Sequence, residues 1–200
     1  MVRIIISVIA TLLLATACAH AAPVAPTSSA PAAHIEGLLA PHVADDYAQD
    51  LHLFGQFAGN WNIRSERYTR DGTTLRSQGG IHIGWILYGT ALQDVWEGNL
   101  DDATPGARPQ GFGTTIRYFD RQIGAWRVVW VAPTANVIQE FSVRQVGSEI
   151  WMEAATPEGF MVKWIWSDMT TTSFNWRSEE SRDGGVTWFT DERTWATRRD

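Results

Sequence analysis

Most of this chain alternates apolar and polar residues, which is the pattern of half-buried β-strands. In the segment NWNIRSERY, for example, Trp61, Ile63 and Ser65 fall on one face and their neighbours on the other. About ten such segments follow Gly59, most of them joined by short turns containing Gly, Asp or Pro. Because a long antiparallel meander loses its free edges by closing on itself, the pattern predicts an all-β fold, a ten-stranded up-and-down barrel.

A different periodicity precedes the strands. In VADDYAQDLHLFGQF, residues 43–57, apolar side chains recur three and four positions apart, at Val43, Tyr47, Leu51 and Phe54. This spacing predicts one short amphipathic helix in front of the barrel. Residues 22–42 are rich in Pro, Ala and Ser and predict a flexible tether, so that the folded domain spans 43–200.

The N-terminus has the pattern of a secretory signal peptide. A short basic start precedes the apolar run Ile4–Ala17, which is too short to span a bilayer that needs about 20 residues, and small residues follow. We expect cleavage after Ala21 and a periplasmic or secreted protein with no transmembrane span. Cleavage before Cys18, with acylation of that cysteine, is the alternative and would make a lipoprotein. Cys18 is the only cysteine, so no disulfide is expected in the folded part.

The composition excludes several partners and cofactors. The net charge is −6 and the basic residues are scattered, with only Arg198 and Arg199 adjacent, which argues against a nucleic-acid partner. No His or Cys pair has the spacing of metal ligands, so no metal site is expected. His82 is alone on a strand between two isoleucines and is expected to face solvent. Nothing in the sequence fixes the oligomeric state.

The octapeptide SRDGGVTW, residues 181–188, fits the Asp-box that sialidase-type β-propellers repeat in each blade. A propeller needs at least four blades of about four strands each, whereas this motif occurs once. Asp183 can accept hydrogen bonds from the amides that follow it, and Gly184 and Gly185 can adopt positive φ. The octapeptide therefore predicts a hairpin turn.

Gly59-x-Trp61, directly after the predicted helix, resembles the G-x-W signature of lipocalins and other calycin barrels. In that family the Trp closes one end of the barrel beneath a basic side chain of the last strand, a position that Arg198 or Arg199 would fill here. The strings GFGTTIRYFDRQIGAWRVVWV and FNWRSEESRDGGVTWFTDERTWATRR are similar to exported bacterial lipocalin-like proteins of unknown function, over most of residues 54–199. The resemblance implies a ten-stranded barrel related in shape to nitrobindins and fatty-acid-binding proteins. Nitrobindin-like barrels hold haem through a histidine near their end; this chain has no histidine after His82, so no haem or other cofactor is expected.

One parity of each strand gives an apolar row that should face the lumen. Asp94 is an acid within this row, and Arg117 on the next strand is the nearest candidate partner. The pair is either a structural lock between two strands or the polar end of a Trp-lined pocket, and the sequence favours neither. The candidate ligand-binding residues are Asp94, Trp96, Arg117, Trp126, Trp130, Trp164 and Trp176.

Three functions are compatible with this pattern. The first is a binding protein that holds a small hydrophobic or aromatic molecule in the barrel. The second is a small cofactor-free enzyme (isomerase, cyclase or hydrolase) with Asp94, Glu179 or Glu192 as base beside Arg117. The third is a filled barrel with a structural role. Binding is favoured, because the sequence offers no nucleophile and no paired carboxylates at a defined spacing.

Overall fold

The computed structural model describes residues 34–35, 38–101 and 111–199. Its strands are β1 (Leu39–Ala40), β2 (Gly59–Tyr68), β3 (Thr74–Ile86), β4 (Ala91–Leu100), β5 (Gly111–Asp120), β6 (Ala125–Ala132), β7 (Val137–Val146), β8 (Glu149–Ala155), β9 (Met161–Ser167), β10 (Ser173–Ser181) and β11 (Phe189–Arg198). Its helical segments are η1 (Asp45–Tyr47), α2 (His52–Gly55), η2 (Leu87–Gly89) and η3 (Pro133–Ala135).

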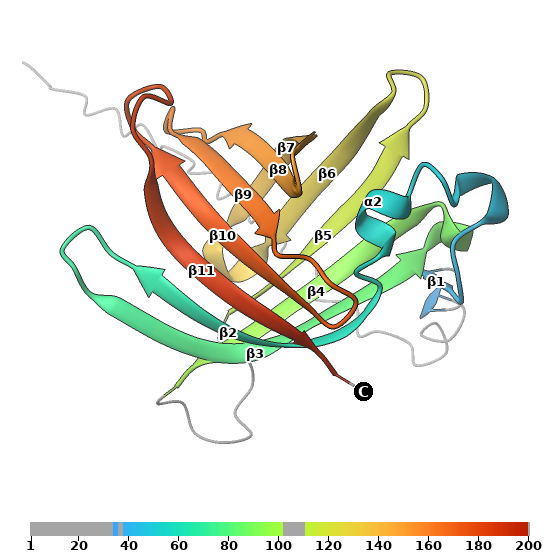
Figure 1. The fold of residues 1–200 in the computed structure, drawn as a ribbon, viewed down its shortest axis with the longest axis horizontal. Helices are drawn as coiled ribbons and strands as arrows, with labels where there is room; N and C mark the ends of the chain where they lie inside the picture. Colours follow the sequence, from blue (N-terminus) through green and yellow to red (C-terminus); the bar gives the residue numbers. More distant parts are fainter. Residues whose placement is uncertain (1–33, 36–37, 102–110, 200) are drawn as a thin grey trace, which may run out of the picture.

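The strands β2 to β11 form one closed antiparallel barrel (Figure 1). Each strand from β2 to β10 pairs with the next one along the chain, and β11 pairs with β2, which closes the ring. The alternation along each strand puts one parity inside, so that Trp61 and Ile81, which are paired across β2 and β3, are both fully buried. The predicted all-β, ten-stranded up-and-down barrel is confirmed.

The segment before the barrel is less helical than its periodicity predicts. In place of one helix over residues 43–57, it forms the 3-10 turn η1 and the four-residue helix α2. Tyr47 stays at the rim, where the Arg121 guanidinium lies 3.8 Å from its ring centroid, whereas Leu51 and Phe54 are buried in the end of the barrel. The chain bends between these positions, so that Tyr47 stays at the surface while Leu51 and Phe54 are buried. Tertiary packing decides the conformation of so short a helix.

The C-terminal part of the predicted tether, residues 22–42, includes a short strand. Leu39 and Ala40 form β1 and pair with Ile86 and Trp85 of β3. At that point the edge of β3 is free, because β2 begins opposite Ile83, and β1 supplies the missing hydrogen-bonding partner. Most of the tether and the whole predicted signal peptide lie outside the described residues. Within the described ranges, no helix is long and apolar enough to cross a membrane.

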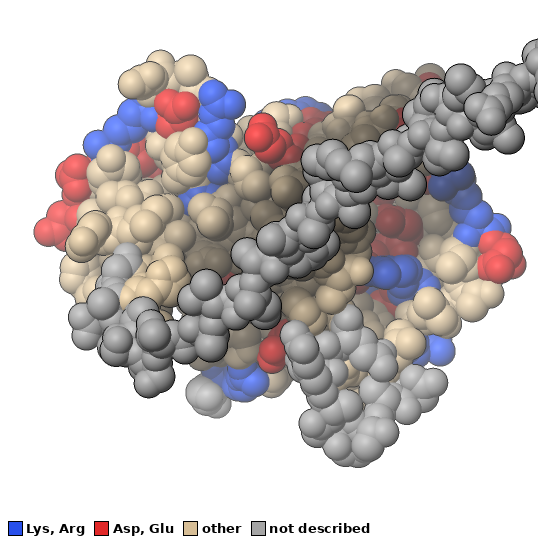
Figure 2. All heavy atoms as spheres, turned by 180° about the vertical axis from the view of Figure 1, so that it is seen from behind, with Lys and Arg blue, Asp and Glu red and all other residues tan. Residues whose placement is uncertain are grey.

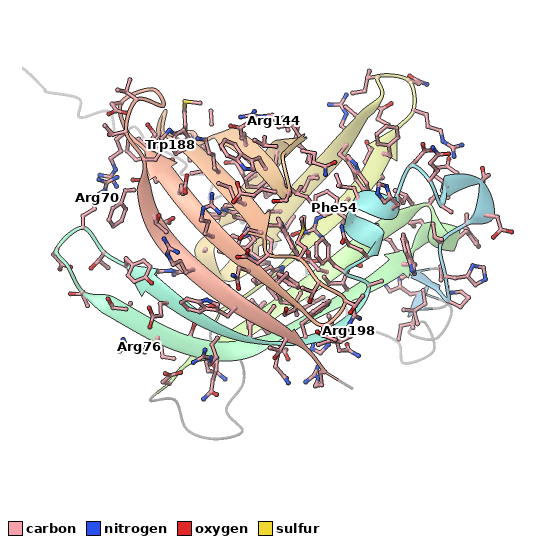
Figure 3. The ribbon with its side chains drawn as sticks, in the orientation of Figure 1. Phe54, Arg70, Arg76, Arg144, Trp188 and Arg198 are labelled. Carbon is pink, nitrogen blue, oxygen red and sulfur yellow. The ribbon has the colours of Figure 1, made fainter. Side chains whose placement is uncertain are left out.

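The G-x-W motif closes the end of the barrel beside α2. Trp61 is fully buried, its Nε1 donates to the Phe57 carbonyl at 2.8 Å, and the Arg198 guanidinium lies 4.2 Å from its ring centroid. Arg198 also donates to the carbonyl of Ala58 at 2.9 Å. Figure 3 shows Arg198 and Phe54 at this same end, which we call the closed end.

Glycine is required at position 59. Its φ of +134° is a conformation that side chains rarely adopt, and a Cβ there would collide with the Arg198 guanidinium. Arg199 points elsewhere, with Nη2 3.3 Å from His82 Nδ1 on the outer surface. The motif is therefore confirmed as a barrel closure, and the basic side chain that completes it is Arg198.

The octapeptide at the opposite end forms the β10–β11 hairpin turn, as predicted. Asp183 Oδ1 accepts from the backbone amides of Val186 at 3.1 Å and Thr187 at 2.9 Å, and from Ser181 Oγ at 2.8 Å. Gly184 and Gly185 have φ values of +74° and +92°. Hydrogen bonds from Thr187 are the main cause that holds the pKa of Asp183 at about 2, well below its usual range.

These bonds predict a pH-dependent role for Asp183. Its folded-state pKa of about 2 lies below the unfolded value of about 3.9, so the carboxylate stabilises the fold above pH 4 and loses that effect as the pH falls toward 2. We expect Asp183→Ala to lower the midpoint of urea unfolding at pH 7, with the difference from wild type shrinking between pH 4 and pH 2. Asp183→Asn, which keeps one acceptor oxygen, should lie between them. A difference independent of pH would contradict this role.

Candidate functional site

The barrel interior is packed at the closed end and hollow toward the other. The hollow part is a cavity of about 540 Å³, within the range of about 300–1,000 Å³ typical of small-molecule sites. Its mouth, at the end opposite Trp61, is lined by Arg67, Leu75, Leu100, Val137 and Glu192. Its floor, next to the packed half, is formed by Thr115, Arg117 and Trp166. The described residues therefore do not fill the barrel.

Four of the predicted tryptophans make the wall of this cavity: Trp96, Trp130, Trp164 and Trp176. Their rings touch in sequence, with centroids 5.5 Å apart for Trp130 and Trp164, 5.4 Å for Trp164 and Trp176, and 5.5 Å for Trp96 and Trp176. Such tilted and edge-to-face contacts fix the rings relative to one another. The wall is a continuous aromatic surface contributed by four different strands.

Gly113, a glycine on β5, sets the position of Trp130. A Cβ on Gly113 would overlap the Trp130 indole, so the missing side chain lets that ring lie against β5. Any side chain at position 113 would displace the indole from its place in the cavity wall. The signal available in the sequence was a glycine at an inward-facing position of a strand.

Asp94 and Arg117 form the predicted ion pair at the floor. Both are buried, with Arg117 Nη1 against Asp94 Oδ2, and Asp94 Oδ1 accepts from the Thr115 amide at 2.9 Å. The guanidinium carbon lies 5.0 Å from the Phe54 ring centroid and 5.6 Å from that of Trp166. Arg117 lines the cavity, whereas Asp94 lies behind it and does not. The pairing is shown; a part in ligand binding stays a prediction.

Trp126 does not reach the cavity. It is buried at the closed end, where its ring lies 4.9 Å from that of Phe54 and 6.0 Å from that of Phe119. Its parity is inward, as predicted, but β6 begins at the closed end and Trp126 is its second residue. It therefore packs beneath the floor, while Trp130, four positions further on, reaches the wall.

Thr115 and Trp166 belong to the floor but were not among the predicted ligand-binding residues. Three buried donors of the floor have no hydrogen-bond partner among the described residues: Thr115 Oγ1, Arg117 Nε and Trp166 Nε1. Asp94 Oδ2, a buried acceptor beside them, has only its ion-pair contact with Arg117 Nη1. The inward parity of Thr115 beside Asp94, and of Trp166 beside Trp164, was the available signal. The polar groups of the floor are therefore incompletely satisfied by the protein itself.

The three carboxylates proposed as alternative catalytic bases lie in different parts of the barrel. Glu179 lies on the outer face and accepts from Arg177 Nε at 2.9 Å. Glu192 lies at the mouth, 2.7 Å from Arg67 Nη2, and burial raises its pKa more than Arg67 lowers it. Asp94 is covered by Arg117. In the described ranges, the structure brings none of these candidate bases to the cavity floor as a free carboxylate.

The outer surface carries the remaining titratable groups. His82 faces outward, as predicted, with Nδ1 2.8 Å from Asn60 Oδ1 and Nε2 3.4 Å from Glu97 Oε1. Residues 34–35, 38–101 and 111–199 contain no group of three or more His, Cys, Asp and Glu side chains arranged to hold a metal ion. On the face seen in Figure 2, acidic and basic side chains are interspersed and no large patch of one sign is visible.

No model of a known protein family matches the chain, and no curated protein sequence is significantly similar to it. Among solved structures, the chain is similar to the S-type phycobiliprotein lyase CPES of Guillardia theta, at 11% identity and a TM-score of 0.52, over 74% of this chain and 92% of that one. It is also similar to Rv2717c of M. tuberculosis, at 11% identity and a TM-score of 0.53, over 79% of this chain and 99% of that one. At such low identity the likeness shows the fold, a lipocalin-like barrel, and nothing finer.

Proposed function

We propose that this protein is an exported binding protein that holds a small hydrophobic or aromatic molecule inside its barrel. The observation that carries the proposal is the cavity of about 540 Å³, walled by four tryptophans and lying above a packed half-barrel. A mostly apolar cavity with a few polar groups at one end is the usual form of a small-molecule site. The contacts among the wall rings support a preformed site, so a ligand would bind with little ordering of the protein.

Aromatic ligands suit this wall better than flexible chains do. A planar molecule can lie against several indole faces at once and gains ring–ring contacts in addition to apolar burial. Trp164 illustrates the geometry, because its ring already packs against Phe141 with centroids 4.4 Å apart and planes at 36°. The enzyme alternative has no comparable support, since Glu192, the candidate base that lines the cavity, lies at the mouth and is paired with Arg67.

Export is the part of the proposal that rests on the sequence alone. The predicted signal peptide, residues 1–21, lies outside the described residues, and both a periplasmic or secreted protein and a lipoprotein remain compatible with its pattern. The N-terminal residue of the mature protein tests it: Ala22 supports soluble export, and an acylated Cys18 supports the lipoprotein. Retention of residues 1–21 in the mature protein would contradict export.

Titration with N-phenyl-1-naphthylamine, a neutral aromatic dye, tests ligand binding. We expect a saturable rise in dye emission with parallel quenching of tryptophan emission, because a dye inside the barrel would lie among the wall indoles. Gly113→Ala should weaken the dye at least tenfold, about 1.4 kcal/mol of binding free energy, by displacing Trp130 from the cavity wall. Gly84→Ala is the matched control, since a Cβ at Gly84 meets nothing within 4 Å. Non-saturable quenching, or equal affinities for all three proteins, would refute binding in this cavity.

A further inference from the structure

The cavity floor presents hydrogen-bond donors for which the fold supplies no acceptor. Thr115 Oγ1, Arg117 Nε and Trp166 Nε1 belong to residues that are 1%, 2% and 1% exposed, and none of the three atoms has a hydrogen-bond partner among the described residues. Buried donors are normally paired, so each unpaired group requires an explanation. All three residues also line the cavity.

The three groups lie close together. Thr115 and Arg117 are two positions apart on β5 and therefore point to the same side of the strand. The Arg117 guanidinium lies 5.6 Å from the Trp166 ring centroid. One ligand group that reaches the floor would meet donors from two strands on different sides of the barrel.

Other polar groups near the cavity are already paired within the protein. Ser65 Oγ and Thr194 Oγ1 are 2.7 Å apart, and Arg67 donates to Glu192 at the mouth. Asp94 accepts from the Thr115 amide and neutralises Arg117. The unpaired donors at the floor therefore need a hydrogen-bond acceptor. They do not need a counter-charge, because Asp94 already balances the charge of Arg117.

Charge balance discriminates between possible acceptors. A carboxylate at the floor would leave water and meet a guanidinium that already has a buried carboxylate as its partner, so two anions would share one cation. An uncharged carbonyl oxygen loses far less hydration on burial and still accepts hydrogen bonds through both of its lone pairs, which neighbouring donors can share.

We propose that the floor recognises an uncharged carbonyl group, as in an aromatic ketone, lactone, amide or quinone, at the inner end of the ligand. Arg117 Nε, Trp166 Nε1 and Thr115 Oγ1 donate to the carbonyl oxygen, and the aromatic rings of the ligand lie against the tryptophan wall. This inference rests on the proposed function and specifies the ligand class and its orientation. A site whose buried donors need an acceptor rejects an analogue that lacks one.

Three probes of nearly the same shape test the inference: 2-acetylnaphthalene, which has the carbonyl; 2-isopropenylnaphthalene, which has a methylene in place of the oxygen; and 2-naphthoate, which has a carboxylate. Each is titrated at pH 7 as a competitor of N-phenyl-1-naphthylamine. We expect the ketone to displace the dye at a concentration at least tenfold lower than either of the other probes.

Two variants remove single donors without changing charge. Thr115→Val and Trp166→Phe should each weaken the ketone about threefold to tenfold relative to the alkene. Thr115→Val should leave the melting temperature of the free protein unchanged or higher, because it removes a buried hydroxyl that has no partner. A merely structural threonine would show the opposite, a lower melting temperature and an unchanged ratio. Trp164→Phe is the control for ring size: it should weaken ketone and alkene equally.

The outcomes separate the two proposals. Equal affinities for ketone and alkene, or tightest binding of the carboxylate, would overturn carbonyl recognition while leaving the cavity as a binding site. Displacement by none of the three probes, with the dye still bound, would also overturn it. Failure of the dye itself to bind would overturn the proposed function, and carbonyl recognition with it.

Discussion

Replacing Trp61 with alanine is expected to lower the free energy of unfolding by about 3–5 kcal/mol, the effect of a large aromatic truncation in a core. Trp61 has no exposed surface, and its ring lies 4.7 Å from Phe174 and 4.2 Å from the Arg198 guanidinium. Its removal would open a void between the helical segment and the first strand. It would also leave the Phe57 carbonyl without its indole donor.

Trp195→Ala is the matched control for this variant. Trp195 lies on the last barrel strand, on its outer face, 36% exposed, with the Arg64 guanidinium 5.9 Å from its ring. Its truncation should change the free energy of unfolding by about 0.5 kcal/mol, as surface substitutions do. Urea unfolding followed by circular dichroism measures both variants without depending on tryptophan emission. Equal losses in the two variants, or no loss for Trp61→Ala, would show that Trp61 does not close the barrel.

The alternation of the sequence was enough to predict which face of each strand is buried, but not how deep a residue lies along the barrel axis. Trp126 and Trp130 show the difference. Both have inward parity on β6, yet one packs beneath the floor and the other lines the cavity. Depth depends on the register of every hairpin around the barrel, and on Gly113, whose missing side chain makes room for the Trp130 ring, and no local pattern encodes either.

The Asp94–Arg117 pair could be predicted because a charged residue in an apolar row demands a partner on a neighbouring strand. Leu92 and Arg117 are directly opposite each other in the β4–β5 ladder, which puts Asp94 within diagonal reach of Arg117. Thr115 and Trp166 are uncharged, so the sequence offers no comparable reason to expect a partner for them. An unpaired donor becomes visible only when all the acceptors around it are known, and those come from strands distant in the chain.

The second large effect is expected at that pair. Arg117→Leu should lower the free energy of unfolding by about 3–5 kcal/mol, because it leaves the fully buried Asp94 carboxylate without a counter-charge. Losing the attraction between the two charges lowers the free energy of unfolding less than leaving the Asp94 carboxylate buried without a partner does. Asp94→Asn combined with Arg117→Leu removes both charges and should recover most of the stability, since replacing a whole buried pair by neutral groups is often nearly neutral.

Arg144→Leu provides the surface comparison. Arg144 forms an ion pair of the same kind with Glu153 at 2.6 Å, but its side chain is 55% exposed. Water screens such pairs, so its removal should change the unfolding midpoint little. If Arg117→Leu is as mild as Arg144→Leu, or if the double variant is no more stable than Arg117→Leu, then Asp94 is not held in place by its charge partner.

Ligand binding by the double variant then distinguishes a structural lock from a recognition element. A double variant that regains stability but binds 2-acetylnaphthalene less tightly by about 1.5–3 kcal/mol, the usual contribution of a hydrogen bond to a charged group, has lost a donor that the ligand used. Wild-type affinity in that variant would mean that Asp94 and Arg117 serve only to join two strands. The Nε of Arg117 has no hydrogen-bond partner while Nη1 holds Asp94, which favours the first result, because one guanidinium has enough donors to do both.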